Sequence, residues 1–564
     1  MGTRGDVQPF CALGQYLAER GWQVTMAAPA EFQEFVGNFK GLDFADIGRS
    51  IQKEVMETPE GQAMRTAGSL KIFKAARAFF NEGLFGFQSV LALCQYLRPT
   101  VLVLTSFIQL CGAAAIPEML GLRTRLVLMH TIPMDLTDEF ACPTAGWGLG
   151  ARRGFGCLNS LSWYAGQKLV VERMYLPVAQ KLVDAAAASL KVPAPTLDIR
   201  FGCEGRPTVY VYSPSILPKP ADWGPHLHVV GAIFAPAHFS ISPDVAARLA
   251  RKQSLAVSRR LTAKVAGSEA GAAPGAPLTH ALSIPTAAEM AGEGPEDGAT
   301  PGAESGSAAS DAIAAHPGTL ATPEAIEEGR VARRATFAAP PTVERLSVLA
   351  PPSTTAPGDT LPPALSAFLD SAEEADLPVV YIGLGSMLAT AFDAERIEEI
   401  MGMCKVVICQ MAKTSRPIRA ILHTTPEAAA GGAPGSPFFM LTQPVDHGAL
   451  LARCQVAVHH GGAGTMHSVM LAGKPCICIP CIPMTDQRFW AEALIRHRVA
   501  PGPLLQIHNL SAAKLTKALN KVLDNLEEYR ANAERLARRI YEENGIQGAA
   551  EVVEGEAALA ATRG

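Results

Sequence analysis

Short apolar runs alternate with amphipathic stretches in two separate parts of the sequence. In the first part we expect a helix over Val7–Arg20, then strands over Trp22–Ala28, Thr100–Thr105 and Leu126–Met129. Continuous apolar runs are typical of strands that are buried on both faces of a parallel sheet. Strands that alternate with helices in this way predict βαβ units and an α/β, doubly wound sheet.

The second part repeats this pattern. We expect buried strands at four apolar runs, Pro378–Ile382, Val406–Cys409, Gln455–Val458 and Cys476–Ile479. From Leu515 to Ile540, apolar positions recur every three or four residues among charges, which predicts a pair of surface helices that closes the chain. Two such domains bind ligands where the C-terminal ends of their strands face a cleft.

A segment of different composition separates the two parts. Of the 120 residues from Ile241 to Thr360, 74 are Ala, Gly, Pro, Ser or Thr, and the one aromatic residue is Phe337. So few large apolar groups cannot offset the entropy lost when the backbone is ordered, so we expect a disordered spacer. The predicted organisation is a domain over 1–238, an insertion over 239–360 and a second domain over 361–564.

The first residues, Met1–Asp6, indicate a turn from a strand into a helix. A Rossmann-like domain normally begins with a central strand that leads into such a turn. We therefore expect that the first strand of the N-terminal domain is missing from this sequence.

Charge and cysteine usage narrow the class of protein. The chain of 564 residues has 49 Lys and Arg against 53 Asp and Glu, and this formal net charge of −4 argues against a globally basic nucleic-acid binder. Twelve cysteines, often inside apolar runs, indicate buried thiols in a reducing compartment. Because no apolar run approaches the ~18 residues that span a bilayer, we expect a cytoplasmic protein.

The strongest local signal is the segment Val456–Ser468, where an apolar strand ends in His459 and His460 and a glycine-rich turn leads into a helix near Thr465. Glycines let the backbone approach an anion closely, and a helix N-terminus offers free N–H groups and positive potential. We expect a diphosphate here, with His460 as a donor to a phosphate oxygen that offsets charge on the leaving nucleotide. The alternative is a turn that serves only helix–sheet packing.

Two polar residues follow the next predicted strand. The carboxylate of Asp486 and the amide of Gln487 are suited to neighbouring sugar hydroxyls. Asp486 is equally suited to cap a helix that begins near Phe489, and the two roles are compatible.

Five segments, in this order and spacing, resemble the sterol 3-β-glucosyltransferases, a family of GT-B glycosyltransferases. The segments are Gly2–Pro9, Tyr212–Trp223, Gly383–Met387, His459–Thr465 and Asp486–Trp490. The resemblance covers nearly the whole chain outside 241–360. It implies two Rossmann-like domains facing a cleft, the N-terminal one for the acceptor and the C-terminal one for UDP-glucose.

The resemblance also implies roles for particular residues. Asp6 would be the base that takes the proton from a sterol hydroxyl, and a carboxylate in an apolar pocket is a competent base. Its place before a first turn that contains Pro9 fits a helix N-cap equally well. Asp486 and Gln487 would contact the glucose hydroxyls. The nucleotide and diphosphate would be held by Ser386, His459, His460, Gly461, Gly462, Ala463, Gly464 and Thr465.

The acceptor implied by the family is a membrane sterol, and one stretch of the first part suits a lipid surface. Phe79 and Phe80 belong to an aromatic cluster whose sequence neighbours include Lys74 and Arg77, as expected for an interfacial helix. An ordinary core helix with a solvated face has the same pattern. With this acceptor, we expect peripheral association with a membrane.

A metal ion or other cofactor is not expected. Cys476, Cys478 and Cys481 lie close together in the sequence, but no second pair or histidine follows at zinc-site spacing, so buried thiols are favoured. The predicted function is transfer of glucose from UDP-glucose to a sterol 3-hydroxyl with inversion. The alternatives are a GT-B transferase for another lipid or a polyketide-like acceptor, and a non-catalytic relative that binds UDP-sugars or lipids.

Overall fold

The computed structural model describes residues 4–48, 57–60, 86–105, 109–143, 156–199, 205–234, 361–385, 392–426, 429, 435–443, 445–482 and 485–562. These residues belong to one compact unit, which consists of Met1–Ala250 together with Pro352–Gly564. The predicted insertion over 239–360 lies outside the described residues.

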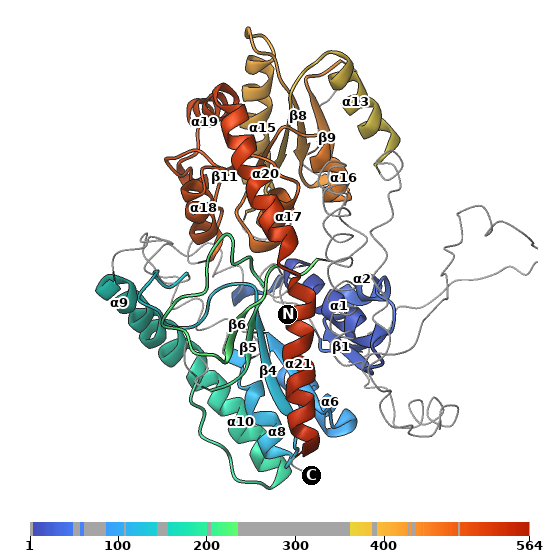
Figure 1. The fold of residues 1–564 in the computed structure, drawn as a ribbon, viewed down its shortest axis with the longest axis vertical. Coiled ribbons are helices and arrows are strands. Elements are labelled where there is room, and N and C mark those ends of the chain that lie inside the picture. The colour runs from blue at the N-terminus through green and yellow to red at the C-terminus, as the bar shows by residue number, and fades with distance from the viewer. Residues whose placement is uncertain are drawn as a thin grey trace, which may run out of the picture. The chain divides into compact units, whose positions relative to one another are not determined.

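Five parallel strands form one sheet in the C-terminal half, in the order β11-β10-β7-β8-β9 (Figure 1). The strands are β7 (Val379–Gly383), β8 (Arg419–His423), β9 (Phe438–Leu441), β10 (Val456–His459) and β11 (Cys476–Cys478). The predicted doubly wound sheet is confirmed in this half, because strands that are not consecutive in the sequence lie side by side.

Helices cover both faces of this sheet. Val380 and Ile382 of β7 belong to an apolar cluster with α15 and α19, whereas Val379 and Tyr381 belong to the cluster that includes α17, α18 and α20. The helices are α13 (Pro363–Glu374), α15 (Ala394–Met411), α16 (His447–Ala452), α17 (Ala463–Leu471), α18 (Gln487–Arg496), η6 (Ile507–Asn509), α19 (Ala512–Asp524) and α20 (Leu526–Glu542).

The strand predicted at Val406–Cys409 is wrong, because these residues lie inside α15. The buried residues of α15 recur every three or four positions, as a helix packed on a sheet requires, and Val406 points to solvent with half of its surface exposed. The carboxylate of Asp393 caps this helix by accepting from the N–H of Arg396 at 2.9 Å.

In the N-terminal half, six parallel strands form two sheets, β1-β2 and β3-β4-β5-β6. No strand of the described residues bridges the two sheets. The strands are β1 (Val24–Ala28), β2 (Leu42–Asp46), β3 (Val101–Thr105), β4 (Arg125–His130), β5 (Thr208–Tyr210) and β6 (Leu227–Val229).

The helices of this half begin with α1, which starts at Arg4 rather than at Val7. They are α1 (Arg4–Glu19), η1 (Ala30–Phe32), α2 (Gln33–Gly37), α6 (Phe87–Leu97), η2 (Ala113–Ala115), α8 (Ile116–Met119), α9 (Gly156–Gly166), the π-helical η3 (Gln167–Tyr175) and α10 (Leu176–Leu190).

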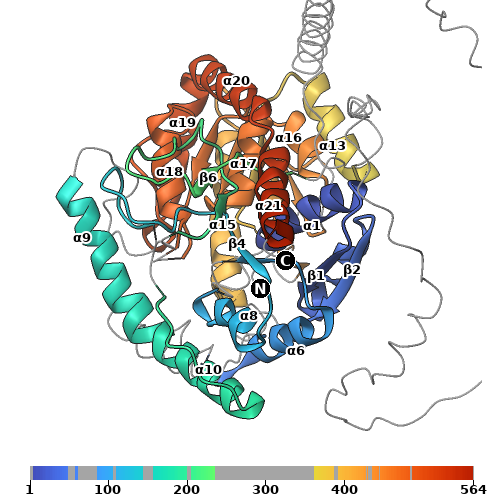
Figure 2. The ribbon, with the colours of Figure 1, turned by 60° about the horizontal axis from the view of Figure 1, so that its bottom comes forward.

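The C-terminal helix α21 (Gly545–Thr562) packs on the N-terminal half, against α1 and β4 (Figures 1 and 2). Two ion pairs tie it there, Arg20 to Glu554 at 2.7 Å and Arg125 to Glu556 at 2.6 Å. The predicted pair of closing helices is confirmed as α19 and α20, and α21 is a third helix that follows them.

Polar contacts also join the stretch Tyr212–Trp223 to the C-terminal half. The Ser213 hydroxyl donates to Glu543 at 2.6 Å, and the Ser213 N–H donates to Nε2 of His467 in α17 at 3.2 Å. The bond to His467 holds α17, and the bond to Glu543 holds the end of α20, against the N-terminal half.

Candidate functional site

The glycine-rich turn joins the end of β10 to the start of α17. Gly461 has a φ of +88°, a conformation that side chains rarely adopt, and Gly462 is the extended N-cap of α17. The helix begins at Ala463, two residues before the predicted start. The N–H groups of its first turn make no bonds within the helix, so this turn has the geometry of an anion site.

The ring of His460 occupies space that only glycine leaves open. A Cβ atom on Gly462 would lie 2.3 Å from Nε2 of His460, and one on Gly385 would lie 2.6 Å from Cε1. Burial, with a smaller contribution from the neighbouring His459, lowers the pKa of His460 to about 3. The imidazole is therefore neutral at physiological pH, and its buried Nδ1 has no hydrogen-bond partner among the described residues.

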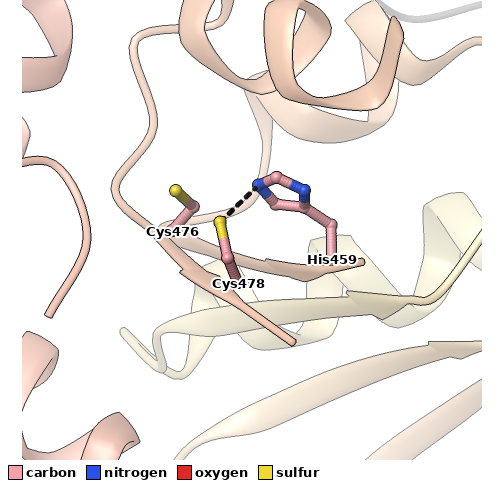
Figure 3. Close-up of side chains that lie close together, drawn as sticks. All are labelled: His459, Cys476 and Cys478. Carbon is pink, nitrogen blue, oxygen red and sulfur yellow. Dashed lines mark hydrogen bonds between the residues drawn. The ribbon is translucent and has the colours of Figure 1, made fainter. Parts of the chain in front are cut away.

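The ring of His459 is directed toward Cys478 on the adjacent strand β11 (Figure 3). Its Nδ1 accepts from the N–H of Gly461 at 3.1 Å, and its Nε2 lies 3.6 Å from the sulfur of Cys478 on the adjacent strand β11. The side chain is fully buried. His459 thus stabilises the turn through its hydrogen bond with Gly461, whereas His460 lies in the turn itself.

Asp486 and Gln487 lie where α18 begins, beside this turn. Asp486 occupies the N-cap position without a side-chain capping bond, and its carboxylate instead accepts from the indole N–H of Trp490 at 2.9 Å. The side-chain oxygen of Gln487 accepts from the N–H groups of Cys481 and Ile482, at 2.8 and 3.2 Å. The amide NH₂ of Gln487 is the part of this side chain suited to donate to a ligand.

The first turn of α1 approaches the same place. A Cβ atom on Gly464 would lie 3.6 Å from Cα of Gly5, so the N-terminal turns of α1 and α17 meet there. Burial, with a smaller contribution from the negative charge of Asp6, raises the pKa of Asp486 to about 7. The structure therefore brings together the residues predicted at Asp6, His460–Thr465 and Asp486. Asp6 is not an N-cap, because α1 starts two residues earlier.

The positions of three further predicted site residues are not described by the structure. Ser386, Phe79 and Phe80 lie outside the described residues.

One group of polar side chains was not predicted. The Tyr381 hydroxyl lies 3.0 Å from Nδ1 of His423 and 3.3 Å from Nε2 of His447, beneath the C-terminal ends of β7 and β8. Burial lowers the pKa of His423. The sequence offered a partial signal, since His423 directly follows an apolar run, but that run was not recognised as a strand.

A second unpredicted residue lies in the N-terminal half. His130 ends β4, is almost fully buried, and its Nδ1 has no hydrogen-bond partner among the described residues. Burial lowers its pKa to about 3. Its ring lies 5.6 Å from that of Tyr210, whose hydroxyl donates a hydrogen bond to the carboxylate of Asp135.

Sequence comparison confirms the resemblance drawn from the motifs. Residues 1–106 match the glycosyltransferase family 28 N-terminal domain, and residues 439–554 match the erythromycin biosynthesis protein CIII-like C-terminal domain. Sterol 3-beta-glucosyltransferase UGT80A2 of Arabidopsis thaliana is 23% identical over 562 residues, an alignment that covers 97% of this chain and 63% of that protein. The chain thus spans less than two thirds of the length of this relative.

Shorter alignments reach higher identity. The sterol 3-beta-glucosyltransferase of Cryptococcus neoformans is 31% identical over 199 residues, which are 34% of this chain and 12% of that protein. The vancomycin aglycone glucosyltransferase of Amycolatopsis orientalis is 35% identical over 159 residues, which are 28% of this chain and 34% of that protein.

Solved structures share the fold. The glycosyltransferase of kitacinnamycin has a TM-score of 0.52 and 13% identity, with 98% of this chain and 96% of that chain covered. The calicheamicin glycosyltransferase CalG4 has a TM-score of 0.51 and 15% identity, with 97% and 94% covered. The fold is therefore GT-B, as predicted.

Proposed function

We propose that this chain, which has the GT-B fold and resembles the sterol 3-β-glucosyltransferases, transfers glucose from UDP-glucose to the 3-hydroxyl group of a membrane sterol and inverts the anomeric carbon. The proposal rests on one observation above all. The neutral ring of His460 lies between Gly385 and Gly462 at the N-terminus of α17, with one buried nitrogen unpaired, where the first turn of α1 also arrives.

The donor diphosphate would bind at the start of α17. Free N–H groups from Ala463 to Thr465 and the positive end of the helix favour an anion. His460 would contribute a hydrogen bond rather than a positive charge, because its low pKa keeps the ring neutral. Ser386 joins this set through the family resemblance.

The glucose hydroxyls would lie against Asp486 and Gln487. An ionised Asp486 accepts hydrogen bonds from hydroxyls, and the amide NH₂ of Gln487 donates to their oxygens. Because the pKa of Asp486 is about 7, a sugar that binds the ionised form would itself lower that pKa.

Asp6 would accept the sterol hydroxyl proton. As the proton leaves, the sterol oxygen bonds to the anomeric carbon from the side opposite the diphosphate, and the bond from that carbon to the phosphate oxygen breaks. UDP departs with the bonding electrons, and the turn at α17 stabilises its charge. Substitution from the opposite side converts the α-linked donor into a β-glucoside.

Helix α9 offers a surface for the membrane. Leu158, Leu161 and Tyr164 follow one another at helical spacing and are exposed at 43%, 54% and 57%. The ammonium group of Lys168 lies over the Tyr164 ring at 5.7 Å. An exposed apolar stripe with an aromatic residue and a lysine at its end is typical of interfacial helices. We propose peripheral binding to a bilayer through this stripe.

A second acceptor class has one observation in its favour. The similarity to a vancomycin aglycone glucosyltransferase over 159 residues makes a soluble polyketide-like or peptide aglycone an alternative to a sterol.

The test is a product assay with UDP-[¹⁴C]glucose and vesicles that contain a panel of sterols, run beside the His460→Ala variant. A labelled steryl glucoside formed by the parent and lost in the variant is the expected result. Labelled product only with soluble aglycones would overturn the sterol acceptor. UDP binding without any product would leave the non-catalytic relative as the explanation.

A further inference from the structure

Three potential metal ligands meet beneath the glycine-rich turn. His459 ends β10, and Cys476 and Cys478 lie on β11, where Cys478 is the register partner of His459. The imidazole nitrogen and the two sulfurs all lie within 4.8 Å of one another, and all three side chains are buried (Figure 3). The two sulfurs lie on one side of the strand because side chains two residues apart share a face.

The spacing suits a soft metal ion. In tetrahedral zinc sites the Zn–S and Zn–N bonds are about 2.3 and 2.0–2.1 Å, which places nitrogen and sulfur ligands roughly 3.6 Å apart. The distance from Nε2 of His459 to Sγ of Cys478 is 3.6 Å. Thiolate and imidazole ligands select ions such as Zn²⁺ and Cd²⁺ over Mg²⁺ or Ca²⁺.

We propose that His459, Cys476 and Cys478 form a site for one soft divalent ion, and that occupation of this site opposes binding of the sugar nucleotide at the turn above it. The second half of this proposal rests on the proposed function, whereas the metal site does not.

The antagonism follows from the tautomer of His459. Its Nδ1 accepts from the N–H of Gly461 at 3.1 Å, so in the neutral ring the proton is on Nε2, which faces the sulfur of Cys478. A metal ion at Nε2 needs the lone pair there, so the ring proton must move to Nδ1. Two N–H groups would then face each other, and Gly461 would have to leave its present position.

The ion binds deprotonated sulfur, so the thiol protons of Cys476 and Cys478 are released to solvent when the site is occupied. With three protein ligands, the fourth position of a tetrahedral ion remains for water.

The experiment measures Cd²⁺ binding through the ultraviolet thiolate-to-cadmium charge-transfer band. The full chain carries Cys157→Ser and Cys203→Ser in every sample. Cys157 is an exposed thiol that would bind metal on its own, and Cys203 lies outside the described residues. We expect one Cd²⁺ per chain, with the band lost in both Cys476→Ala and Cys478→Ala. The matched control is Cys481→Ala, a buried thiol whose sulfur donates to the carbonyl of Ile479, and it should keep the band.

Circular dichroism of each variant checks that it folds. If one of the two cysteine variants does not fold, the other still tests the site. Absence of the band in the parent, or its persistence in both variants, would overturn the metal site.

The antagonism is tested by the stabilisation that UDP gives in thermal unfolding, with and without Zn²⁺. We expect Zn²⁺ to reduce the UDP-dependent shift of the parent but not that of Cys476→Ala. An equal UDP shift with and without a bound ion would overturn the antagonism. A parent that binds Cd²⁺ but shows no UDP shift without metal would contradict the proposed function and leave the metal site supported.

Discussion

At the scale of single residues, the site depends on glycines that leave room for His460. A methyl group on Gly462 would come within 2.3 Å of Nε2 of the buried His460 ring. We expect Gly462→Ala to lower the free energy of unfolding by about 1–3 kcal/mol and to weaken UDP binding, because the ring or the turn must shift.

The matched control is Gly402→Ala, in the interior of α15, where a Cβ atom would meet nothing within 4 Å. This change should raise the free energy of unfolding by about 0.5–1 kcal/mol. Urea unfolding and titration calorimetry with UDP measure both effects. Unchanged UDP affinity in Gly462→Ala would contradict the role assigned to the ring.

Asp486 should make stability depend on pH. Burial and the charge of Asp6 raise its pKa from the ordinary 3.8 to about 7, so the folded protein holds this proton more tightly than the unfolded chain. The stabilisation that this proton gives is complete below about pH 4 and is lost as the pH rises through about 7.

We therefore expect the free energy of unfolding to fall between about pH 4 and pH 7 more steeply in the parent than in Asp486→Asn. Asp6→Asn, which removes the neighbouring charge, should give a slope between the two. Urea unfolding at a series of pH values measures this. Parallel profiles for the parent and Asp486→Asn would exclude the raised pKa.

The pattern along the chain revealed the residues of the turn because their neighbours in sequence are also their neighbours in space, whereas Asp6 was assigned only through the family resemblance. His460 and the glycines after it form one contiguous turn, so the pattern alone revealed them. His459 meets Cys478 from an adjacent strand, and Tyr381 meets two histidines from different elements, so no spacing along the chain could reveal these contacts.

At the scale of elements, most of the strands that we predicted from apolar runs are present in the structure, but one is not. Val406–Cys409 has the apolar density of a strand, yet it is one part of the buried stripe of α15, which becomes visible only over a longer window. The helix α21 was missed because its buried face consists largely of small residues, and its partners α1 and β4 lie more than 400 residues away in the sequence.

The ion pair between α21 and β4 gives a test at this scale. Arg125 and Glu556 are partly buried, with side-chain exposures of 30% and 11%. We expect Glu556→Gln to lower the free energy of unfolding by about 1–3 kcal/mol, because a partly buried guanidinium loses its charged partner. The exposed pair of Arg416 and Asp524 is the control, and Asp524→Asn should cost less than about 0.5 kcal/mol. Equal losses in urea unfolding would show that α21 is not held by this pair.

At the scale of the whole molecule, the proposed function requires the protein to reach a lipid acceptor. None of the helices in the described part of the chain is long and apolar enough to cross a membrane. The exposed stripe on α9 is the surface to which we assign this task. Replacing Leu158 and Leu161 together by Ser should reduce co-sedimentation with sterol-containing vesicles, because the apolar area that enters the bilayer is lost.

The control for the stripe is Val406→Ser, which removes an apolar side chain with 50% exposure from α15. Its vesicle binding should match that of the parent. If the stripe variant co-sediments as well as the parent, α9 does not bind the bilayer.

The central claim is that Asp6, brought beside the turn of α17, takes a proton during transfer of the sugar. The most direct measurement compares product formation and UDP affinity in Asp6→Asn, using vesicles that contain the best sterol of the panel. We expect transfer to fall by about 10²–10⁴-fold while UDP affinity is unchanged, because an amide cannot accept the proton but keeps the shape of the side chain. Full transfer by Asp6→Asn would contradict the claim.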